Sequence, residues 1–359
     1  LVLFALSAQA QDTLRHSLHD VTVTADRVPS ATVAQAPTQV LQVERLEQQG
    51  IESLSEATRL LSGVTLKDYG GVGGMKTISA RGLGSQFSML ALDGVPVSDC
   101  QNGQVDLGRY ALGEADYIGF AQGQFSDFLQ SARALAAGNV MNMESRRPDS
   151  TGGRLALEGG SYGLLSPTLS FQHKVTPRWS YTLWGNYLQC EGDYPFTLYY
   201  TVSGRDSSSV ERREHSAVKN ATLEGNLFYR HGRHDWVTKV RHYQSEMQLP
   251  GPVVYYSTRG TEQTTARVSL LQSRYRLAIS DQLRLQVMGK YSNLFDTYSD
   301  TNLYTPTYNE YLQQEGYLSA TLAYEPLDRL TFSLATDGAL SALRSNLPTH
   351  NEVHRRSSQ

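Results

Sequence analysis

The chain has 359 residues, of which 40% are hydrophobic and 19% charged, so it is long enough for two folded domains and its composition argues against disorder. Its 32 Lys and Arg against 35 Asp and Glu give a formal net charge of -3, which offers no electrostatic reason to expect nucleic acid as a partner. Two cysteines are too few for a disulfide-rich scaffold or a zinc module, and no apolar run approaches the ~18 residues of a membrane-spanning helix.

Residues 1–10, LVLFALSAQA, are a short apolar run that ends in Ala-Gln-Ala, the pattern of a signal-peptidase site. A buried strand or helix is the alternative, but the polar residues that follow favour the remnant of an export signal, with the mature chain beginning at Gln11. Residues 11–19 are polar, and we expect them to be a flexible segment. Export would place both thiols in an oxidising compartment.

Up to about residue 148 the sequence is rich in Gly, Ala, Leu and Gln and predicts a small α+β unit. Ser53 and Glu56 form a capping box, because the hydroxyl can accept from the amide three residues on while the carboxylate reaches back. Gly63 supplies a left-handed stop for the helix. The buried face of this helix is expected to hold Leu54, Ala57, Leu60 and Leu61. Short strands are expected at 21–24, 38–43, 77–81, 88–92, 117–120 and 140–144.

From residue 153 onward polar and apolar residues alternate with a period of two, the pattern of β-strands with two different faces. Nine such strands are predicted, at 154–160, 168–175, 179–188, 222–230, 236–243, 266–279, 283–291, 317–324 and 330–336. The connections at 176–178, 231–234, 280–282 and 325–328 are predicted to be tight turns, whereas 189–221, 244–264 and 292–316 are predicted to be long polar loops.

Short turns at one end and long loops at the other are typical of a transmembrane β-barrel. A soluble β-sandwich or propeller would also alternate, but here one face ends in aromatic residues suited to a membrane interface while the other is polar, as in a wet lumen. Nine strands are too few to enclose a large pore, so we expect the chain to hold only part of a barrel. The aromatic residues concerned are Trp179, Tyr181, Tyr187, Tyr229, Tyr291 and Tyr324.

Three segments carry motifs in a definite order. Residues 20–27 read DVTVTADR, residues 79–84 read SARGLG and lead to MLALDGVPV at 89–97, and residues 134–143 read ALAAGNVMNM. In that order they resemble the TonB box, the paired plug motifs and the closing plug strand of the TonB-dependent outer-membrane receptors of Gram-negative bacteria. The family's Gly-Gly pair in the closing strand is here Gly138-Asn139. Within the family, the resemblance is to siderophore and cobalamin receptors.

The resemblance implies an α+β plug domain inside a transmembrane antiparallel β-barrel, located in the outer membrane. The implied domains are a signal-peptide remnant (1–10), a flexible periplasmic segment (11–19), the TonB box and plug (20–148) and the N-terminal part of the barrel (149–359). The implied function is energy-coupled import of a scarce, bulky solute of the ferric siderophore or cobalamin class. Such a protein is not an enzyme, and no catalytic arrangement, metal site or cofactor site is predicted from the residues.

Energy coupling would depend on an extended segment near the start of the chain. The resemblance implies that TonB, driven by its inner-membrane motor, adds a strand to this segment, a mode in which main-chain hydrogen bonds carry the load. The alternative is that the segment is merely the first strand of the plug. The residues concerned are Asp20, Val21, Thr22, Val23 and Thr24.

The plug motifs supply the next candidates. Arg81 has a planar donor fork suited to a carboxylate in the plug or on the barrel, Gly82 permits a close turn, and Asp93-Gly94 is a hairpin turn. Alternatively, Arg81 and Asp93 serve only the plug's own fold. Because plug apices of the family contact solute, the expected substrate-binding residues are Asp99, Gln101, Asn102 and Gln104. In the loops, Tyr199, Tyr200, Tyr255 and Tyr256 are either further substrate contacts or part of an aromatic girdle.

Cys100 lies in the apex loop and Cys190 begins the first long barrel loop, on the same side if the turns alternate as expected. A disulfide between them and two independent thiols are both open. Expected partners are TonB, outer-membrane lipid, a small-molecule solute and a surface lipoprotein. Two other functions remain as alternatives, a passive outer-membrane pore and a soluble exported glycan-binding β-protein.

Overall fold

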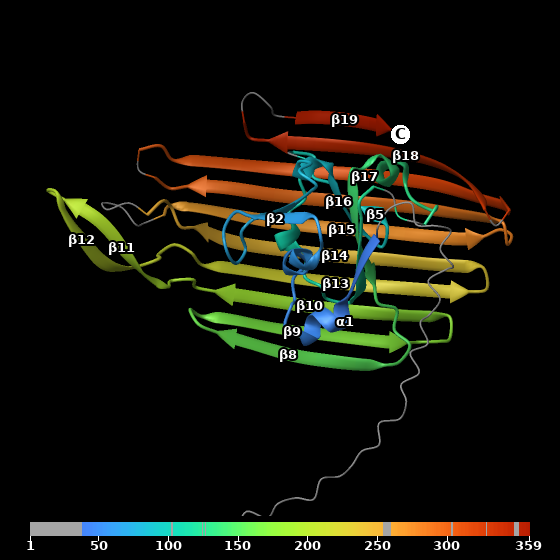
Figure 1. The fold of residues 1–359 in the computed structure, drawn as a ribbon, viewed down its shortest axis with the longest axis horizontal. Coiled ribbons are helices and arrows are strands. Elements are labelled where there is room, and N and C mark those ends of the chain that lie inside the picture. The colour runs from blue at the N-terminus through green and yellow to red at the C-terminus, as the bar shows by residue number, and fades with distance from the viewer. Residues whose placement is uncertain are drawn as a thin grey trace, which may run out of the picture.

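The computed structural model describes residues 38–101, 103–123, 125, 127–253, 260–302, 304–327, 329–347 and 352–359. Residues 38–145, called the plug below, form a small mixed unit that lies over one face of a large antiparallel sheet (Figure 1). The predicted change from an α+β unit to an antiparallel sheet is therefore confirmed. The predicted signal remnant, the flexible segment and the strand at 21–24 lie outside the described residues.

The plug is built on a five-stranded sheet with the order β1-β6-β7-β4-β5, and β2 and β3 form a separate pair. β4 runs parallel to β7, and the other neighbours are antiparallel. The strands are β1 (Thr38–Gln42), β2 (Val64–Asp68), β3 (Lys76–Ala80), β4 (Ser88–Leu92), β5 (Val95–Pro96), β6 (Ala115–Ala121) and β7 (Asn139–Ser145). The helices are α1 (Val43–Gln48), α2 (Leu54–Ala57) and α3 (Ala132–Ala136), with 3-10 turns η1 (Thr58–Leu60), η2 (Ser85–Phe87) and η3 (Leu107–Arg109).

The plug has its own apolar core. Leu54, Leu92, Ile118, Phe120 and Met141 are fully buried in it. β4 and β6 are mostly apolar, and β4, β6 and β7 are largely buried, because both faces of these central strands are covered. The apolar character of β4 and β6 explains why the sequence located them well. β2, which pairs with β3, is mostly polar and partly exposed and was missed.

The capping box at the start of α2 is confirmed. The Ser53 hydroxyl accepts from the Glu56 amide at 3.2 Å. The helix is shorter than expected, however, because the chain tightens into η1 after Ala57. That change of pitch rotates Leu60 outward, so Leu60 is 49% exposed while Leu61 stays buried. Gly63 has the positive φ of +75° expected of the stop residue.

The large sheet has ten strands in the order β19-β18-β17-β16-β15-β14-β13-β10-β9-β8, every neighbouring pair antiparallel. A two-stranded hairpin projects beyond it (Figure 1). The sheet strands are β8 (Gly152–Gly160), β9 (Leu164–Lys174), β10 (Trp179–Cys190), β13 (Val218–His231), β14 (His234–Leu249), β15 (Glu262–Ala278), β16 (Leu283–Asp300), β17 (Thr307–Leu327), β18 (Leu330–Ser345) and β19 (Glu352–Ser358). The hairpin is β11 (Pro195–Val202) and β12 (Arg205–Arg212).

All nine predicted strands are present, but several extend far into segments expected to be loops. β16 and β17 together absorb most of 292–316, β14 extends into 244–264, and 189–221 contains the hairpin β11–β12. The sequence missed these extensions because their polar side chains break the alternation that signals a half-buried strand. For the same reason β19, whose sequence is EVHRRSS, was not predicted.

The two ends of the large sheet differ. The connections at 175–178, 232–233 and 279–282 are short and lie together at what we call the turn end. The opposite edge, which we call the loop end, carries the long excursion between β10 and β13 and the segments after β14 and β16. The predicted turn alternation is therefore confirmed in outline.

The two faces of the large sheet also differ, as the alternation predicted. Positions such as Gln272 and Arg274 contact the plug, so the intervening positions face away from it. Those outer positions are rich in exposed apolar side chains, including Leu155 (78% exposed), Leu334 (73%) and Leu318 (63%). At the turn end Trp179 packs against Tyr229 with ring centroids 4.6 Å apart. Among the described residues, no helix has the length and apolar character needed to cross a bilayer.

Candidate functional site

A cavity lies between the plug and the large sheet, toward the loop end. It has a volume of about 130 Å³ and is bounded by the plug segment that follows β5 and by β14, β15 and β16. Three of the four predicted apex residues line it, namely Asp99, Gln101 and Gln104, whereas Asn102 lies outside the described residues. Their contact with a solute remains a prediction. The other polar residues that line the cavity are Ser98, Asp106, Arg109, Tyr110, Arg241, Lys290, Ser292 and Asp296.

Arg109 joins the plug to the large sheet across this cavity. Its Nε lies 3.3 Å from Asp106 Oδ2 within the plug, and its Nη2 donates at 3.3 Å to Asp296 Oδ2 on β16. Asp106 also accepts from the amides of Lys76 and Gly108 at 2.9 Å, so it holds η3 and β3 together. Burial opposes the charge on Arg109, but the two carboxylates outweigh it and raise the pKa of the guanidinium.

Arg241 lines the cavity from β14. It donates to the main-chain oxygen of Arg109 and lies 4.6 Å from the ring centroid of Tyr110 and 5.6 Å from that of Tyr243. Its Nε also lies 3.8 Å from Glu224. A guanidinium between two aromatic rings is held by cation–π attraction as well as hydrogen bonds, so its position is firmly fixed.

A second ionic cluster lies beside the cavity. The ammonium of Lys290, on β16, donates to Glu315 Oε2 at 2.7 Å, to Ser98 Oγ at 3.0 Å and to the Pro96 main-chain oxygen at 2.8 Å. Arg133 of α3 donates to the same Glu315 at 3.0 Å. The Glu315 carboxylate therefore pairs with Lys290 of the large sheet and with Arg133 of the plug. These pairs join the apex of the plug to β16 and β17.

A third cluster surrounds the turn between β4 and β5. Asp93 and Gly94 have positive φ angles of 52° and 81°, so the predicted hairpin turn is confirmed. Asp93 is fully buried; its carboxylate accepts from the amide and hydroxyl of Ser145 at 2.7 and 2.9 Å and lies 3.4 Å from Lys239 on β14. Lys239 in turn is 2.9 Å from Glu224 on β13.

Arg274 on β15 completes this cluster. It donates to the main-chain oxygen of Asp93 at 2.7 Å and to Glu144 on β7 at 2.6 Å. Burial opposes ionisation of Glu144, but the Arg274 guanidinium outweighs it and lowers the pKa of Glu144 to about 2. Burial raises the pKa of Asp93, although Lys239 opposes the shift. In the Asp93–Lys239 and Glu144–Arg274 pairs, one residue belongs to the plug and the other to the large sheet. The plug is therefore held by polar contacts, as expected.

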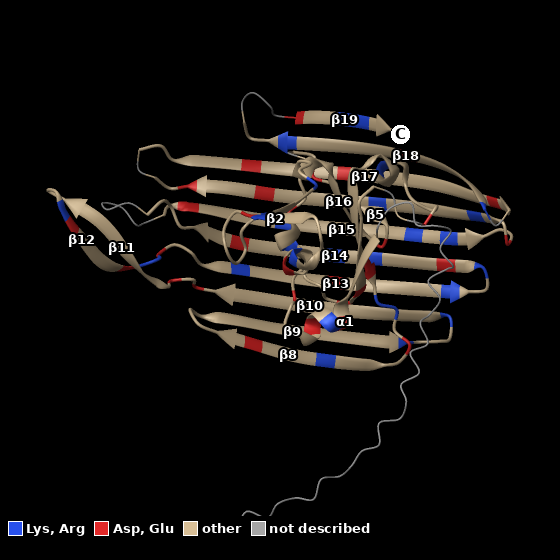
Figure 2. Ribbon diagram, in the orientation of Figure 1, with Lys and Arg blue, Asp and Glu red and all other residues tan. Residues whose placement is uncertain are grey.

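Figure 2 shows that both acidic and basic positions occur along the strands of the large sheet. The sequence predicted a polar inner face for the large sheet but did not single out its members. The signal was present, because each is a charged residue at an inner position of an alternating strand. The residues that were missed are Glu224, Lys239, Arg241, Arg274, Lys290, Glu315 and Asp337.

The prediction for Arg81 is wrong as far as an ion pair is concerned. Arg81 follows β3 with a φ of 50°, is exposed, and pairs with no carboxylate among the described residues, and Gly82 continues the turn with a φ of 75°. The turn leaves this residue exposed to solvent. Arg109, Arg133 and the cations of the sheet make the contacts that were expected of it.

The two cysteines are separate free thiols, so the disulfide alternative is wrong. The thiol of Cys100 contacts the Ser341 side chain on β18, and burial raises its pKa. The thiol of Cys190, at the end of β10, donates instead to the main-chain oxygen of Tyr162. Five strands separate β18 from β10 in the sheet, which is far beyond the Cα separation of about 7 Å that a disulfide can bridge.

The tyrosines predicted in the loops are only partly described. Tyr199 and Tyr200 lie on β11 of the projecting hairpin, where Tyr199 is 79% exposed. Tyr255 and Tyr256 lie outside the described residues, as do the coupling residues Asp20, Val21, Thr22, Val23 and Thr24. Substrate contact by any of these residues and pairing with TonB remain predictions.

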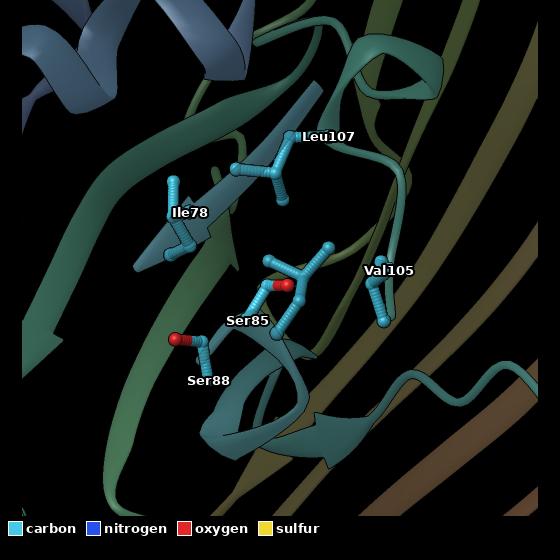
Figure 3. A pocket seen from close by; sticks show the side chains of 6 residues that line it. Ile78, Ser85, Ser88, Val105 and Leu107 are labelled. Atoms are coloured by element: carbon cyan, nitrogen blue, oxygen red, sulfur yellow. The ribbon is translucent and has the colours of Figure 1, made fainter. Parts of the chain in front are cut away.

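A second cavity lies inside the plug (Figure 3). It measures about 10 Å³ and is lined mainly by apolar side chains. That volume is at the lower limit for a single water molecule, so it is a packing defect of the plug core. The residues around it are Ile78, Ser85, Ser88, Leu90, Val105 and Leu107. Among the described residues no group of three or more His, Cys, Asp or Glu is arranged to hold a metal.

The plug and the large sheet together resemble the architecture of known proteins. Residues 31–137 match the family model of the TonB-dependent receptor plug domain. The structure is similar to that of the ferric citrate transporter FecA in its unliganded form, with a TM-score of 0.65 and 17% identity over 90% of this chain and 49% of that one.

Two further solved structures show the same likeness. The siderophore receptor PirA from Pseudomonas aeruginosa has a TM-score of 0.60 and 16% identity over 90% of this chain and 52% of its own. The copper transporter OprC has a TM-score of 0.63 and 14% identity over 89% and 50%. The chain thus spans about half the length of the structures it matches. Residues 31–137 thus match the plug domain of TonB-dependent receptors, and the plug with the antiparallel strands that follow it has the fold of the corresponding part of these receptor structures.

Proposed function

We propose that the receptor containing this chain imports a scarce, bulky solute across the outer membrane of a Gram-negative bacterium, with energy delivered through TonB. The observation that carries the proposal is the way the plug is held. Ion pairs join the plug to the sheet, such as Arg274 with Glu144 and Arg133 with Glu315. They lie beside a small apolar cluster in which Val95 of the plug packs with Met288 and Tyr317 of the sheet. Polar contacts can be exchanged for water stepwise, which lowers the cost of moving a pulled plug.

The outer face of the sheet supports a membrane location. Exposed apolar side chains such as Leu155, Leu318 and Leu334 would meet lipid there, and the turn-end aromatic residues Trp179 and Tyr229 would lie at the interface with the headgroups. The proposed partners are outer-membrane lipid, TonB and the solute, with a surface lipoprotein as a further candidate. The solute class proposed is a ferric siderophore or a cobalamin.

The coupling segment provides the test. Val21→Pro removes a main-chain donor from the strand proposed to pair with TonB. In a strain that makes the full-length receptor, we expect this change to abolish uptake of the labelled solute while binding at the cell surface persists. Leu14→Pro, in the polar segment ahead of the box, is the matched control and should preserve both.

Unchanged uptake by the Val21→Pro receptor would remove residues 20–24 from coupling and would favour a passive pore. Loss of binding together with uptake would instead indicate that the substitution disturbs the plug. Recovery of the protein in the periplasm and not in the outer-membrane fraction would favour a soluble exported protein.

A further inference from the structure

The outer face of the large sheet becomes polar toward the loop end. Neighbouring strands place four polar side chains in one cross-strand row there, at positions that face away from the plug: His242 on β14, Ser269 on β15, Asn293 on β16 and Gln314 on β17. His242 Nδ1 lies 2.9 Å from Ser269 Oγ, so these two side chains bond to each other along the surface. Such a row can form hydrogen bonds with a polar headgroup but gains nothing from acyl chains.

This polar row marks the border of the apolar band. The adjoining outer row on the turn-end side holds Val240, Leu271 and Leu340, all of them exposed. On the loop-end side lies Arg267, roughly 20 Å from Tyr275 along the membrane normal, because each residue of a tilted strand advances about 2.5 Å. The apolar band of a transmembrane barrel is about 25 Å tall, so the long side chain of Arg267 reaches the level of the lipid headgroups.

Two cations near this border have no carboxylate partner in the described part of the chain. Lys219 on β13 and Arg267 on β15 are exposed, and neither side chain forms an ion pair or a hydrogen bond with a described residue. Arg344, an exposed outer cation on β18, differs because it lies 3.0 Å from Glu352. Cations at headgroup level attract lipid phosphates, and the planar fork of an arginine can bind two phosphate oxygens at once.

An acidic side chain lies beside Lys219. Glu246 is directly opposite Lys219 in the ladder between β13 and β14 and is exposed, but the two do not form an ion pair. Glu246 opposes the approach of a phosphate and offers a ligand for a divalent cation that would bridge to one. Direct contact is favoured here, because two cations face one carboxylate and Arg267 lies in a different row, opposite Gln244.

We propose that the outer face of β13–β17 near the loop end binds a phosphorylated glycolipid. Lys219 and Arg267 contact its phosphates, the polar row bonds to its sugar hydroxyls, and Val240 and Leu271 pack against its acyl chains. A sugar headgroup fits better than a simple phospholipid, because the row crosses four strands and is about 14 Å wide at the spacing of neighbouring strands. The inference rests on the proposed outer-membrane location, but on neither the solute nor the coupling segment.

Equilibrium binding of lipids to the purified full-length receptor, in detergent micelles free of other lipid, tests the inference. The probes are bisphosphorylated lipid A, the same lipid with both phosphates removed, and dioleoyl phosphatidylglycerol as an anionic lipid without a sugar headgroup. We expect bisphosphorylated lipid A to bind at least tenfold more tightly than either of the others. Equal binding of phosphatidylglycerol would indicate a general anionic-lipid surface, and equal binding of the dephosphorylated lipid would show that phosphates are not recognised. Either result overturns the inference.

The double variant Lys219→Gln, Arg267→Gln provides the second measurement. We expect its affinity for bisphosphorylated lipid A to fall at least tenfold, with protection of the plug from protease unchanged as evidence of folding. Arg344→Gln removes an exposed outer cation that already has a carboxylate partner, so this matched control should change the affinity by less than about twofold. Glu246→Gln should increase the affinity. Loss of binding in the Glu246→Gln variant, or on addition of EDTA, would show that a divalent cation carries the contact and would overturn direct pairing.

The two proposals fail in different ways. If the double variant binds lipid A as tightly as the wild type, the lipid site falls, while loss of uptake in the Val21→Pro receptor still supports energy-coupled import. If lipid A binds as expected but Val21→Pro leaves uptake unchanged, the lipid site stands and the coupling proposal falls.

Discussion

Lys239 makes a buried contact between the plug and the large sheet. Its ammonium lies 2.9 Å from Glu224 and 3.4 Å from Asp93, and its side chain is 2% exposed. Two carboxylates thus depend on one buried cation. Removal of one partner from a buried ionic group is far more costly than loss of an exposed pair, because the remaining charge cannot reach water.

Lys239→Met should therefore destabilise the docked plug by about 3–5 kcal/mol. The measurement is protection of the plug from a protease as urea concentration increases, in the refolded receptor. Lys219→Met, at an exposed outer position of the neighbouring strand β13, should stay within about 0.5 kcal/mol of the wild type. Equal behaviour of the two variants would contradict a role for Lys239 in holding the plug.

Glu144 gives the plug a defined acid sensitivity. Its pKa is lowered from 4.5 to about 2 because Arg274 outweighs the effect of burial. A lowered carboxyl pKa stabilises the folded state at pH values above 4.5, and this stabilisation is lost as the pH falls toward 2. Glu144→Gln should cost on the order of 3 kcal/mol at pH 7, and the difference should vanish near pH 2.

The free energy of unfolding measured from pH 7 to pH 2 checks this expectation. Asp116→Asn, an exposed carboxylate on the adjacent strand β6, should change stability by no more than about 0.5 kcal/mol at pH 7. A constant difference between the Glu144→Gln variant and the wild type across the whole range would contradict the ion pair with Arg274.

At the scale of elements, the plug helix α3 is fixed to the large sheet by an aspartate side chain of β18. Asp337 on β18 accepts from the amides of Ala132 and Arg133 at 3.2 and 2.7 Å, and from the hydroxyl of Tyr317 at 2.7 Å. Ser131 supplies the ordinary cap through the amide of Ala134. A helix of five residues is too short to be stable by itself, so these contacts hold its position.

Asp337→Ala should destabilise the docked plug by about 2–4 kcal/mol, since it removes the acceptor that two amides and a buried phenol share. Hydrogen exchange at the amides of Ala132 and Arg133 should accelerate. Ser333→Ala on the same strand removes only one exposed hydrogen bond, to Phe128, and is the matched control. Slow exchange retained in the Asp337→Ala variant would show that α3 is held by other contacts.

At the scale of the whole molecule, the contact between Cys100 and Ser341 allows the plug apex to be tethered to β18. Ser341→Cys should form a disulfide with Cys100 under oxidising conditions. If import requires the apex to move, uptake by the oxidised receptor should fall at least tenfold and recover after reduction, while solute binding is unchanged. The control combines Ser341→Cys with Cys100→Ser, and full uptake by the oxidised tether would contradict movement of the apex.

Local patterns in the sequence were sufficient for much of the fold. The capping box of Ser53 and Glu56, the Asp93-Gly94 turn and the strand β4 involve only near neighbours, and each was predicted at the right residues. Alternation located the strands of the large sheet for the same reason. It failed at β19 and at the loop-end extensions, where polar residues interrupt the apolar face and the period is weak.

The sequence by itself determined that an α+β unit precedes alternating strands with one polar and one apolar face, because these depend on spacing along the chain. Only the tertiary structure decided which charges meet. Lys239 reaches Asp93, Arg274 reaches Glu144 and Arg109 reaches Asp296 across long stretches of sequence. Alternation fixes the face on which a side chain lies, but the docking of the plug and the strand order fix its partner. For that reason Arg81, the natural choice from its motif, pairs with no carboxylate among the described residues.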